Sequence, residues 1–599
     1  MSIFGDPVML ATEPDMLTFL HLPEEAEARR TAILLCPPFG WAAQCSYRPL
    51  RIWAASLARA GYPVMRATPP GSGDSSGEAD DADQLGSWRR TVPVTAAWLR
   101  ERTRADHVVA LGIGLGGMLA WLAACDGAPI DDLILWAVPA RGRALVRELR
   151  SRSALIARHD EIAPEPDGGS QPSEPVPAED GLNLIGFRIS EQTAEALSSV
   201  RLDEHSPPMP DERRVLLLSR DSLPVDRALH DHLARLGVIV ETRQTRDYDQ
   251  LIADPLQARA PSATMALTLD WLERGTDEGP SRRSRSTASI AAQADVLRAG
   301  SGSVRETPLR VAGVHGDLFG IVAAPAACRP APLAVVWLGA GPLPHTGPNR
   351  AWVRAARRWA ARGVPTVRVD LSGIGESGGD DHRLLCDDSL YAPWRVDDAR
   401  AVLDHLSAVG LADRFVLGGL CSGAYTSLHA ALADDRVRGL LLINLVLISY
   451  SEALIVQRGR RAQLDAGLPA RRHAHVNVAL PAKAMKYIRP DRAWGLLTRS
   501  EERADHKRAL TALDRLLARD VQTLLLLGDR EPLLAQFGRH GLLDGIGRWP
   551  NLTLERLPSS DHMLRESSVQ RRMHQLLDAA LERVLRAEDP ESADSYATA

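Results

Sequence analysis

The stretch that decides the fold reads RFVLGGLCSGAYTSLHAALA, from Arg414 to Ala433. Its first part is apolar and predicts a buried strand, and its alanine-rich last part predicts a helix. Between them, Gly419-Leu420-Cys421-Ser422-Gly423 forms a G-x-C-x-G pattern, whose glycines permit a sharp turn from strand to helix. Such a turn exposes its middle side chain at the carboxyl end of the strand. The sequence therefore predicts that Cys421 is a nucleophile.

A similar elbow occurs earlier in the chain without a nucleophile. The strand-like run from His107 to Leu111 leads into Gly112-Ile113-Gly114-Leu115-Gly116-Gly117. Gly114 stands where the later elbow has Cys421, and glycine has no side chain with which to attack a substrate. We therefore expect one chemically active half and one silent half.

The two halves also align outside the elbows. Residues 51–77 match residues 354–379, and in both an amphipathic helix precedes a buried strand and a Gly-x-Gly-acid-Ser turn. These turns are Gly71-Ser72-Gly73-Asp74-Ser75 and Gly373-Ile374-Gly375-Glu376-Ser377. A repeat this long indicates a duplicated domain and not a solenoid of short units.

Polar, unpatterned segments set the expected domain boundaries. The expected parts, in chain order, are a first domain at 1–274, a linker at 275–305, a second domain at 306–586 and a disordered tail at 587–599. Within the first domain, the Pro- and acid-rich stretch 164–180 is expected to be a disordered excursion.

Bulk composition limits the classes of function. The 599 residues suffice for roughly two to four domains. A net charge of −5 argues against a nucleic-acid partner, which needs a concentrated basic face. The N-terminus lacks the basic region of a signal peptide, and no apolar run approaches the roughly 18 residues of a membrane span. The six cysteines have no metal or disulfide spacing, so we expect a cytoplasmic protein with usable thiols.

Short apolar runs alternate with helical patterns in both halves. This alternation predicts an α/β fold in which each half has a mainly parallel sheet with helices on both faces. Ligands then gather at the carboxyl ends of the strands. The expected strands lie at 33–35, 64–65, 108–111, 133–138 and 215–218 in the first half, and at 335–338, 366–369, 415–417, 440–443, 523–527 and 552–557 in the second.

A nucleophile at an elbow needs a base and an orienting acid, which follow it in the order acid, then histidine. Two carboxylates, Asp529 and Glu531, come directly after the buried run 524–527. His562 follows the next expected strand and precedes the final helix. We expect His562 to take the thiol proton of Cys421 and a carboxylate to orient the imidazole. Glu531 is the preferred acid, and Asp529 is the alternative.

Backbone groups beside Cys421 complete the predicted site. The elbow places this cysteine at a helix N-terminus, where the helix dipole favours a thiolate. The N–H of Ser422 and one N–H from the loop that contains Ala340 and Gly341 are expected to form the oxyanion hole.

The first half lacks the corresponding base as well as the nucleophile. Ser219-Arg220-Asp221-Ser222 aligns with the loop that carries Glu531, so at most Asp221 remains as an acid. Tyr248 aligns with His562. The first half is therefore interpreted as a pseudo-enzyme.

These motifs together resemble the α/β-hydrolase superfamily, with two copies of the fold over about nine-tenths of the chain. The branch that they resemble is that of the serine-aminopeptidase-like and exosortase-associated hydrolases. The residues that carry the resemblance are Cys36-Pro37-Pro38-Phe39-Gly40 and Pro69-Pro70-Gly71-Ser72-Gly73-Asp74-Ser75 in the first copy, and Gly347-Pro348-Asn349-Arg350, Asp370-Leu371-Ser372-Gly373-Ile374-Gly375-Glu376-Ser377 and the Cys421 elbow in the second.

The resemblance implies hydrolysis or transfer of an acyl group from an ester, thioester or amide. The chain departs from the usual pattern because cysteine replaces serine, as it also does in dienelactone hydrolases and polyester synthases. A cap at about 449–518 is expected to shape the acyl pocket. The expected partner is a small-molecule acyl substrate, with no cofactor and no metal, and the silent copy is a candidate site for a protein partner.

Several other interpretations compete with this one. Cys421 could be a buried structural residue, or Ser422 the nucleophile if the elbow shifts by one position. Gly112 to Gly117 also fits a dinucleotide fingerprint, but no acid ends the next strand as that fingerprint requires. His473 and His475 resemble half of a metal site without a third ligand. A non-catalytic tandem scaffold with two relic elbows is the remaining alternative.

Overall fold

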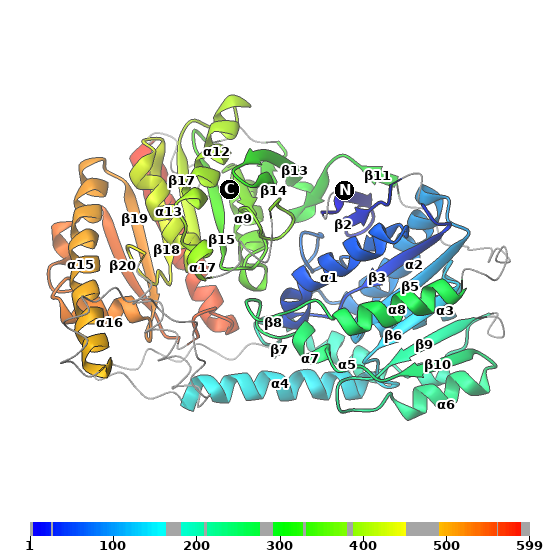
Figure 1. Cartoon of the computed structure of the whole chain (residues 1–599). Helices are drawn as coiled ribbons and strands as arrows, with labels where there is room; N and C mark the ends of the chain where they lie inside the picture. The colour runs from blue at the N-terminus through cyan, green and yellow to red at the C-terminus, as the bar shows by residue number, and fades with distance from the viewer. Residues whose placement is uncertain are drawn as a thin grey trace.

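The computed structural model describes residues 4–24, 28–162, 181–208, 213–275, 292–327, 331–379, 387–450, 490–559 and 561–588. Two nine-stranded sheets lie side by side, one in each half of the chain (Figure 1). The strands of the N-terminal half are β1 (Asp6–Ala11), β2 (Met16–His21), β3 (Thr31–Cys36), β4 (Val64–Arg66), β5 (His107–Ile113), β6 (Asp132–Trp136), β9 (Arg214–Leu218), β10 (Ile239–Arg243) and β11 (Ala292–Ala294), with a separate hairpin of β7 (Leu182–Leu184) and β8 (Phe187–Ile189).

The sheet of the C-terminal half repeats the arrangement. Its strands are β12 (Leu297–Ala299), β13 (Val304–Gly313), β14 (Gly316–Pro325), β15 (Ala334–Ala340), β16 (Thr366–Val369), β17 (Phe415–Leu420), β18 (Val437–Ile443), β19 (Gln522–Gly528) and β20 (Leu552–Leu557). The spatial order is β11-β1-β2-β4-β3-β5-β6-β9-β10 in the first sheet and β12-β13-β14-β16-β15-β17-β18-β19-β20 in the second. In both sheets the first two strands of the parallel part are swapped relative to their order in the chain, β4 before β3 and β16 before β15, so the two sheets have the same topology.

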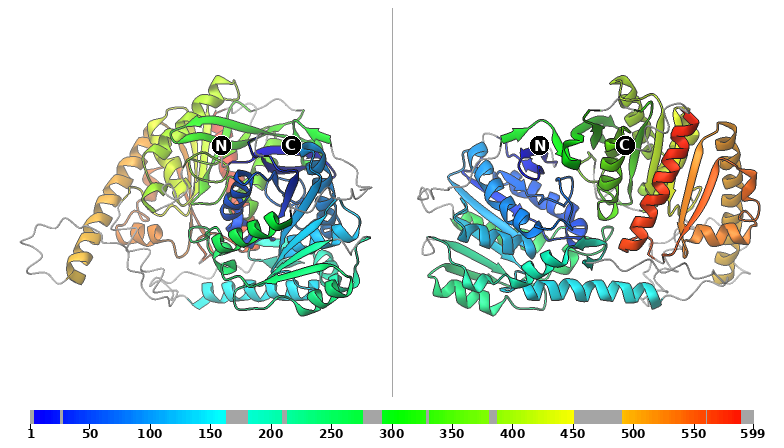
Figure 2. Two further views of the ribbon diagram at one scale, coloured as in Figure 1. Left: turned by 45° about the vertical axis from the view of Figure 1, so that its right-hand side comes forward. Right: turned by 180° about the vertical axis from the view of Figure 1, so that it is seen from behind.

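Helices cover both faces of each sheet (Figures 1 and 2). In the N-terminal half they are α1 (Trp41–Arg59), α2 (Gln84–Thr103), α3 (Leu115–Cys125), α4 (Gly142–Ile162), α5 (Glu191–Ser199), α6 (Arg227–Arg235), α7 (Tyr248–Leu251) and α8 (Ser262–Gly275). In the C-terminal half they are α9 (Ala351–Ala361), α11 (Asp387–Leu390), α12 (Trp394–Ala408), α13 (Ser422–Ala433), α15 (Pro490–Ala518), α16 (Pro532–Arg539) and α17 (Ser567–Glu588). Each half therefore has one apolar core on either side of its sheet.

The structure confirms the predicted fold class and each predicted strand. Sequence reasoning missed the antiparallel strands β1, β2, β13 and β14. Part of the segment expected as a linker, 275–305, also forms strands. Within this segment, β11 pairs with β1 and β12 pairs with β13. The first two residues of β13 also lie within it.

Other expected features fall wholly or partly outside the described residues. These are the excursion at 164–180, the cap residues 451–489 and the tail beyond Glu588. The later part of the expected cap is helix α15, whose residues Ala509, Ala512 and Leu516 belong to the core of the C-terminal half. Among the described helices, none has both the length and the apolar character needed to cross a bilayer.

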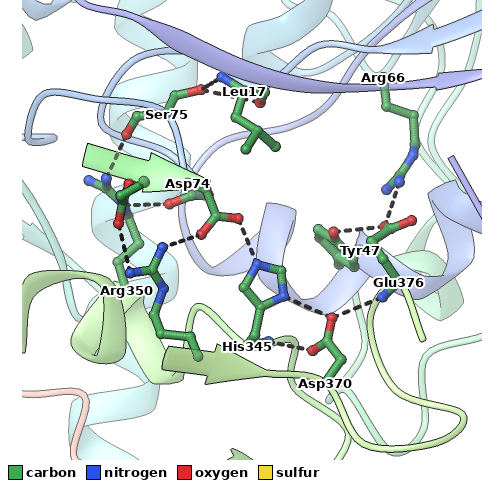
Figure 3. A network of polar contacts seen from close by, with 12 residues as sticks. Leu17, Tyr47, Arg66, Asp74, Ser75, His345, Arg350, Asp370 and Glu376 are labelled. Atoms are coloured by element: carbon green, nitrogen blue, oxygen red, sulfur yellow. Dashed lines mark hydrogen bonds and ion pairs between the residues drawn. The ribbon is translucent and has the colours of Figure 1, made fainter. Parts of the chain in front are cut away.

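The two halves meet through a pair of equivalent ion pairs. Arg66 of β4 contacts Glu376 at 2.5 Å (Figure 3). Arg368 of β16 contacts Asp74 at 3.0 Å. The two arginines occupy corresponding strands, and the two acids occupy the corresponding Gly-x-Gly-acid-Ser turns. The interface is therefore nearly two-fold symmetric, as in a homodimer with self-complementary contacts.

An apolar cluster accompanies these buried charges. Phe19 of β2 packs edge-to-face on Phe319 of β14 at 5.7 Å, and the cluster continues through both halves. Beside it His345 is fully buried and contacts Asp74 and Asp370, each at 2.8 Å. Charged and apolar groups of both halves therefore meet across this boundary.

Candidate active site

The elbow after β17 has the backbone that the sequence predicts. Cys421 has φ 60° and ψ −114°, a conformation that few residues other than glycine adopt. Its N–H donates to the carbonyl of Ile443 at 3.0 Å, which ties the turn to the neighbouring strand β18. Helix α13 begins at the next residue. A strained residue held between a strand and a helix is typical of a functional position.

The two glycines of the motif are needed because the backbone segments touch. A Cβ atom at Gly423 would collide with the carbonyl oxygens of Leu338 and Gly339 at the end of β15. A Cβ atom at Gly419 would collide with Gly423 and with the same carbonyl of Leu338. Helix α13 can therefore start close enough to the sheet only if both positions lack a side chain.

The structure brings Glu531 to His562 and leaves Asp529 elsewhere. His562 Nδ1 lies 2.7 Å from Glu531 Oε1, and the glutamate is buried at the start of α16. Asp529 instead accepts a hydrogen bond from Arg556 at 3.2 Å and is partly exposed. Of the two candidate acids, only Glu531 is positioned to orient the imidazole.

The sulfur of Cys421 has two polar neighbours. The Tyr391 hydroxyl lies 3.5 Å from it, and the charge and hydrogen bonding of His562 lower its pKa. Because His562 Nδ1 faces Glu531, Nε2 is the ring nitrogen left to act on the sulfur. The His562 side chain is 37% exposed, so a ligand in solvent can reach the pair.

The electrostatics of the pair favour charge separation. Burial raises the pKa of the Cys421 thiol, but the His562 charge and hydrogen bonds from His562 and Tyr391 outweigh burial and lower it below the usual value. Burial likewise lowers the pKa of His562, but Glu531 and Cys421 raise it well above its ordinary range. The arrangement therefore stabilises a thiolate beside an imidazolium.

The predicted oxyanion groups lie around the same elbow. The N–H of Ser422 is in the first turn of α13, where backbone donors have no partner inside the helix. Ala340 ends β15 and pairs with Leu420 beside the elbow. Gly341 follows with φ 59°, in a tight turn closed by a hydrogen bond from Leu343 N to Ala340 O.

Two site residues were missed by sequence reasoning. Asn444 follows β18, and its side chain accepts from Gly528 N and donates to His562 O, both at 2.8 Å. It therefore ties the acid-bearing loop to the histidine-bearing loop. Tyr391, which precedes α12, is the second. A polar residue directly after a buried strand was the only available signal for Asn444, and nothing local marks Tyr391.

The elbow of the N-terminal half has the same backbone as the Cys421 elbow but carries no side chain at its middle position. Gly114 has φ 53° and ψ −117°, and its N–H donates to Trp136 O at 3.0 Å. Tyr248, at the position that corresponds to His562, is buried with its ring edge-on to Trp136 at 5.3 Å. Asp221 accepts a hydrogen bond from Asp249 N and meets no imidazole.

The other described cysteines lie in environments unlike that of Cys421. Burial raises the pKa of Cys36 and of Cys125 to about 12, and it also raises the pKa of Cys45. Among the cysteines that the structure describes, Cys421 is the one whose thiolate is favoured.

No metal centre is present among the described side chains, since none of their His, Cys, Asp and Glu residues form a group of three placed to hold an ion. His473 and His475 lie outside the described residues. A cavity of about 100 Å³ lies between the halves, near the carboxyl ends of β3 and β4, and is lined by residues that include Tyr47, Arg66 and Thr346. It is separate from Cys421.

No protein-family profile matches the chain. Over 95 residues, or 16% of its length, the chain is 33% identical to the uncharacterized protein YcjY of Escherichia coli (strain K12). The match spans 29% of that relative.

Among solved structures, the chain is similar to XC6422 from Xanthomonas campestris, described as an α/β serine hydrolase without a lid (21% identity, 47% of this chain and 94% of that one, TM-score 0.26). It is also similar to proline iminopeptidase from Mycobacterium smegmatis (15% identity, 47% of this chain and 100% of that one, TM-score 0.30). A third similar structure is a thermophilic esterase from Thermogutta terrifontis (19% identity, 46% of this chain and 99% of that one, TM-score 0.28). On the strand order of its two sheets and the geometry of its elbow, the chain has the fold of the α/β-hydrolase superfamily.

Proposed function

We propose that the chain is an acyl hydrolase in which Cys421 is the nucleophile, His562 the base and Glu531 the orienting acid. The observation that carries the proposal is that His562 Nδ1 lies 2.7 Å from the buried Glu531, while the charge of His562 lowers the pKa of Cys421. Cys421 itself lies at a strained elbow, where a nucleophile is exposed to substrate.

The reaction follows from this geometry. The Cys421 thiolate attacks the acyl carbonyl of an ester, thioester or amide, while the N–H groups of Ser422 and of the Ala340–Gly341 turn receive the oxyanion. The protonated His562 then gives its proton to the leaving group. Neutral His562 next removes a proton from water, which attacks the acyl-cysteine and releases the acid.

The N-terminal half is proposed to be a silent copy that supports the active one. Arg565 belongs to the loop that follows His562. Its guanidinium carbon lies over the ring of Trp41 of the N-terminal half, 5.4 Å from the ring centre. The Gly186 carbonyl of the N-terminal half accepts from Gln570 at 3.2 Å. Asp74 contacts His345 on the loop that follows β15. Both loops that flank Cys421 thus touch the N-terminal half.

The test is to detect the covalent acyl-enzyme by mass spectrometry. Wild-type protein incubated with activated acyl esters and thioesters is expected to gain one acyl group by intact mass, located on the peptide that contains Cys421. Cys421→Ala should lose the adduct. Cys125→Ala is the matched control, because it removes a distant thiol of the silent half, and it should keep the adduct.

If wild type and Cys421→Ala behave alike across a broad panel of acyl donors, the hydrolase proposal is wrong and a tandem scaffold with relic elbows is favoured. An acyltransferase would use the same acyl-cysteine. With an acyltransferase, adding a sugar or amine acceptor would yield acylated acceptor, and the amount of free acid released would fall by the same amount.

A further inference from the structure

The hydroxyl of Tyr391 is the second polar group on the Cys421 sulfur, at 3.5 Å. Tyr391 lies between α11 and α12, far from the elbow in sequence, and only 8% of it is exposed. Its ring packs edge-on against Tyr425 at 5.1 Å and lies 6.2 Å from the ring of Tyr450. The packing of these rings holds the hydroxyl beside the sulfur.

The direction of this hydrogen bond follows from the state of the sulfur. A neutral thiol and a phenol can each donate, but a thiolate has no proton and can only accept. Tyr391 must therefore donate when Cys421 is ionised. Since an unperturbed phenol ionises near pH 10, it keeps this proton at neutral pH. Together with His562, Tyr391 then gives the sulfur two donors, and hydrogen bonds to a charged acceptor are strong.

We propose that Tyr391 is a further catalytic residue, which stabilises Cys421 as a thiolate together with His562, and that this pair of donors directs the site to thioester substrates. This inference rests on the proposed function.

The preference for thioesters comes from how the tetrahedral intermediate breaks down. Cys421 and the leaving group compete for departure, and the group with the lower pKa leaves faster. Two donors make the Cys421 sulfur a good leaving group. The alkoxide of an oxygen ester therefore leaves the tetrahedral intermediate less often than Cys421 does, and most of the intermediate returns to the ester. The thiolate of a thioester, with an ordinary pKa, leaves about as readily as Cys421.

The steps balance without an added reactant other than water. The Cys421 thiolate forms a bond to the carbonyl carbon, and the oxyanion then collapses with cleavage of the bond between that carbon and the leaving sulfur. The leaving thiolate takes the proton from His562. Water loses a proton to His562 and attacks the acyl-cysteine, and Cys421 departs as a thiolate again accepting from Tyr391. The products are a carboxylic acid and a thiol.

The first experiment measures the ionisation of Cys421 directly. The rate of alkylation by iodoacetamide is followed against pH, with the modified peptide identified by mass. Tyr391→Phe, which keeps the ring, should raise the apparent pKa of Cys421 by about one unit, so that alkylation below that pKa slows by about tenfold. Tyr425→Phe removes a neighbouring hydroxyl that does not touch the sulfur, and it should leave the profile unchanged.

The second experiment compares an oxygen ester and a thioester with the same acyl group in the wild type. The measured quantity is the ratio of the acylation rate with the thioester to the acylation rate with the oxygen ester. We expect this ratio to be at least about tenfold higher for Cys421 than for a free thiol in solution. This comparison does not depend on whether a variant folds. Tyr391→Phe should reduce the preference, while Tyr425→Phe should not.

The outcomes separate the two proposals. If Cys421 is acylated but Tyr391→Phe changes neither the alkylation profile nor the ester preference, the role of Tyr391 is wrong and the hydrolase remains. If the wild type prefers the oxygen ester, the thioester assignment is overturned. If Cys421 is not acylated by any donor, the proposed function itself fails.

Discussion

His562 meets Glu531, and not Asp529, although the two acids are separated by one residue on the same loop. Glu531→Gln keeps the size of the side chain but removes the charge that holds the imidazolium. We expect kcat to fall by roughly 10²- to 10⁴-fold, as in other nucleophile–histidine–acid sites. Asp529→Asn is the matched control and should stay near wild type in steady-state acyl hydrolysis. The reverse pattern would show that the acid is misassigned.

Selective thiol labelling is a second prediction. The pKa of Cys421 is lowered, whereas burial raises the pKa of Cys36 and Cys125 to about 12. A brief treatment with iodoacetamide at pH 7 should therefore modify Cys421 well before those two. Peptide mapping measures the order. Equal modification of Cys125 and Cys421 would contradict the proposed thiolate.

Asn444 is expected to be a positioning residue. It connects Gly528 N to His562 O, so Asn444→Ala breaks both hydrogen bonds and leaves buried groups unpaired. We expect a loss of roughly 1–3 kcal/mol in the free energy of unfolding, and a fall in kcat larger than any change in KM. Asn444 has φ 44°, so Asn444→Gly provides the comparison that removes the hydrogen bonds without backbone strain. If both variants keep full kcat, the link has no catalytic role.

The buried imidazole of the interface makes stability depend on pH. Burial lowers the pKa of His345, but Asp370 and Asp74 outweigh it and raise the pKa from 6.5 to about 10. A raised pKa contributes stability that is complete below about pH 6.5 and is lost as the pH rises through about 10. Chemical denaturation between pH 7 and 10 should show this decline in the wild type.

His345→Gln should flatten that decline, and it should cost roughly 3–5 kcal/mol at neutral pH because two buried carboxylates lose their partner. His315→Gln, at an exposed position, is the control and should keep the wild-type slope. An unchanged slope in His345→Gln would mean that this imidazole is not charged in the folded protein.

Restoring a cysteine to the silent elbow should not restore chemistry. No heavy atom lies within 4 Å of where a Cβ at Gly114 would stand, so Gly114→Cys fits the space, with strain from its φ of 53°. Tyr248 stands where an imidazole is needed. On a background that lacks Cys421, we expect Gly114→Cys to fold and to gain no acyl adduct by intact mass. Acylation at position 114 would show that the silence of this half comes from the missing thiol alone.

The sequence predicted the parts of the structure that local patterns encode. Buried parallel strands such as β17 are continuous apolar runs, and the Cys421 elbow is a compact motif whose glycines have a steric cause. Glu531 and His562 were predicted as site residues because each follows a strand, and the structure brings their side chains to 2.7 Å. Tyr391 could not be found this way, since its approach to the sulfur depends on how a loop packs. The ion pairs of Asp74 and Glu376 join segments from opposite halves, and no local pattern predicts such contacts.

The matched ion pairs between Arg66 and Glu376 and between Arg368 and Asp74 lie within one chain, so the contact between the halves is independent of protein concentration. Each half supplies the acid that neutralises the arginine of the other, as the subunits of a self-complementary dimer do. Separate subunits would come apart on dilution, whereas one polypeptide keeps both sets of groups together.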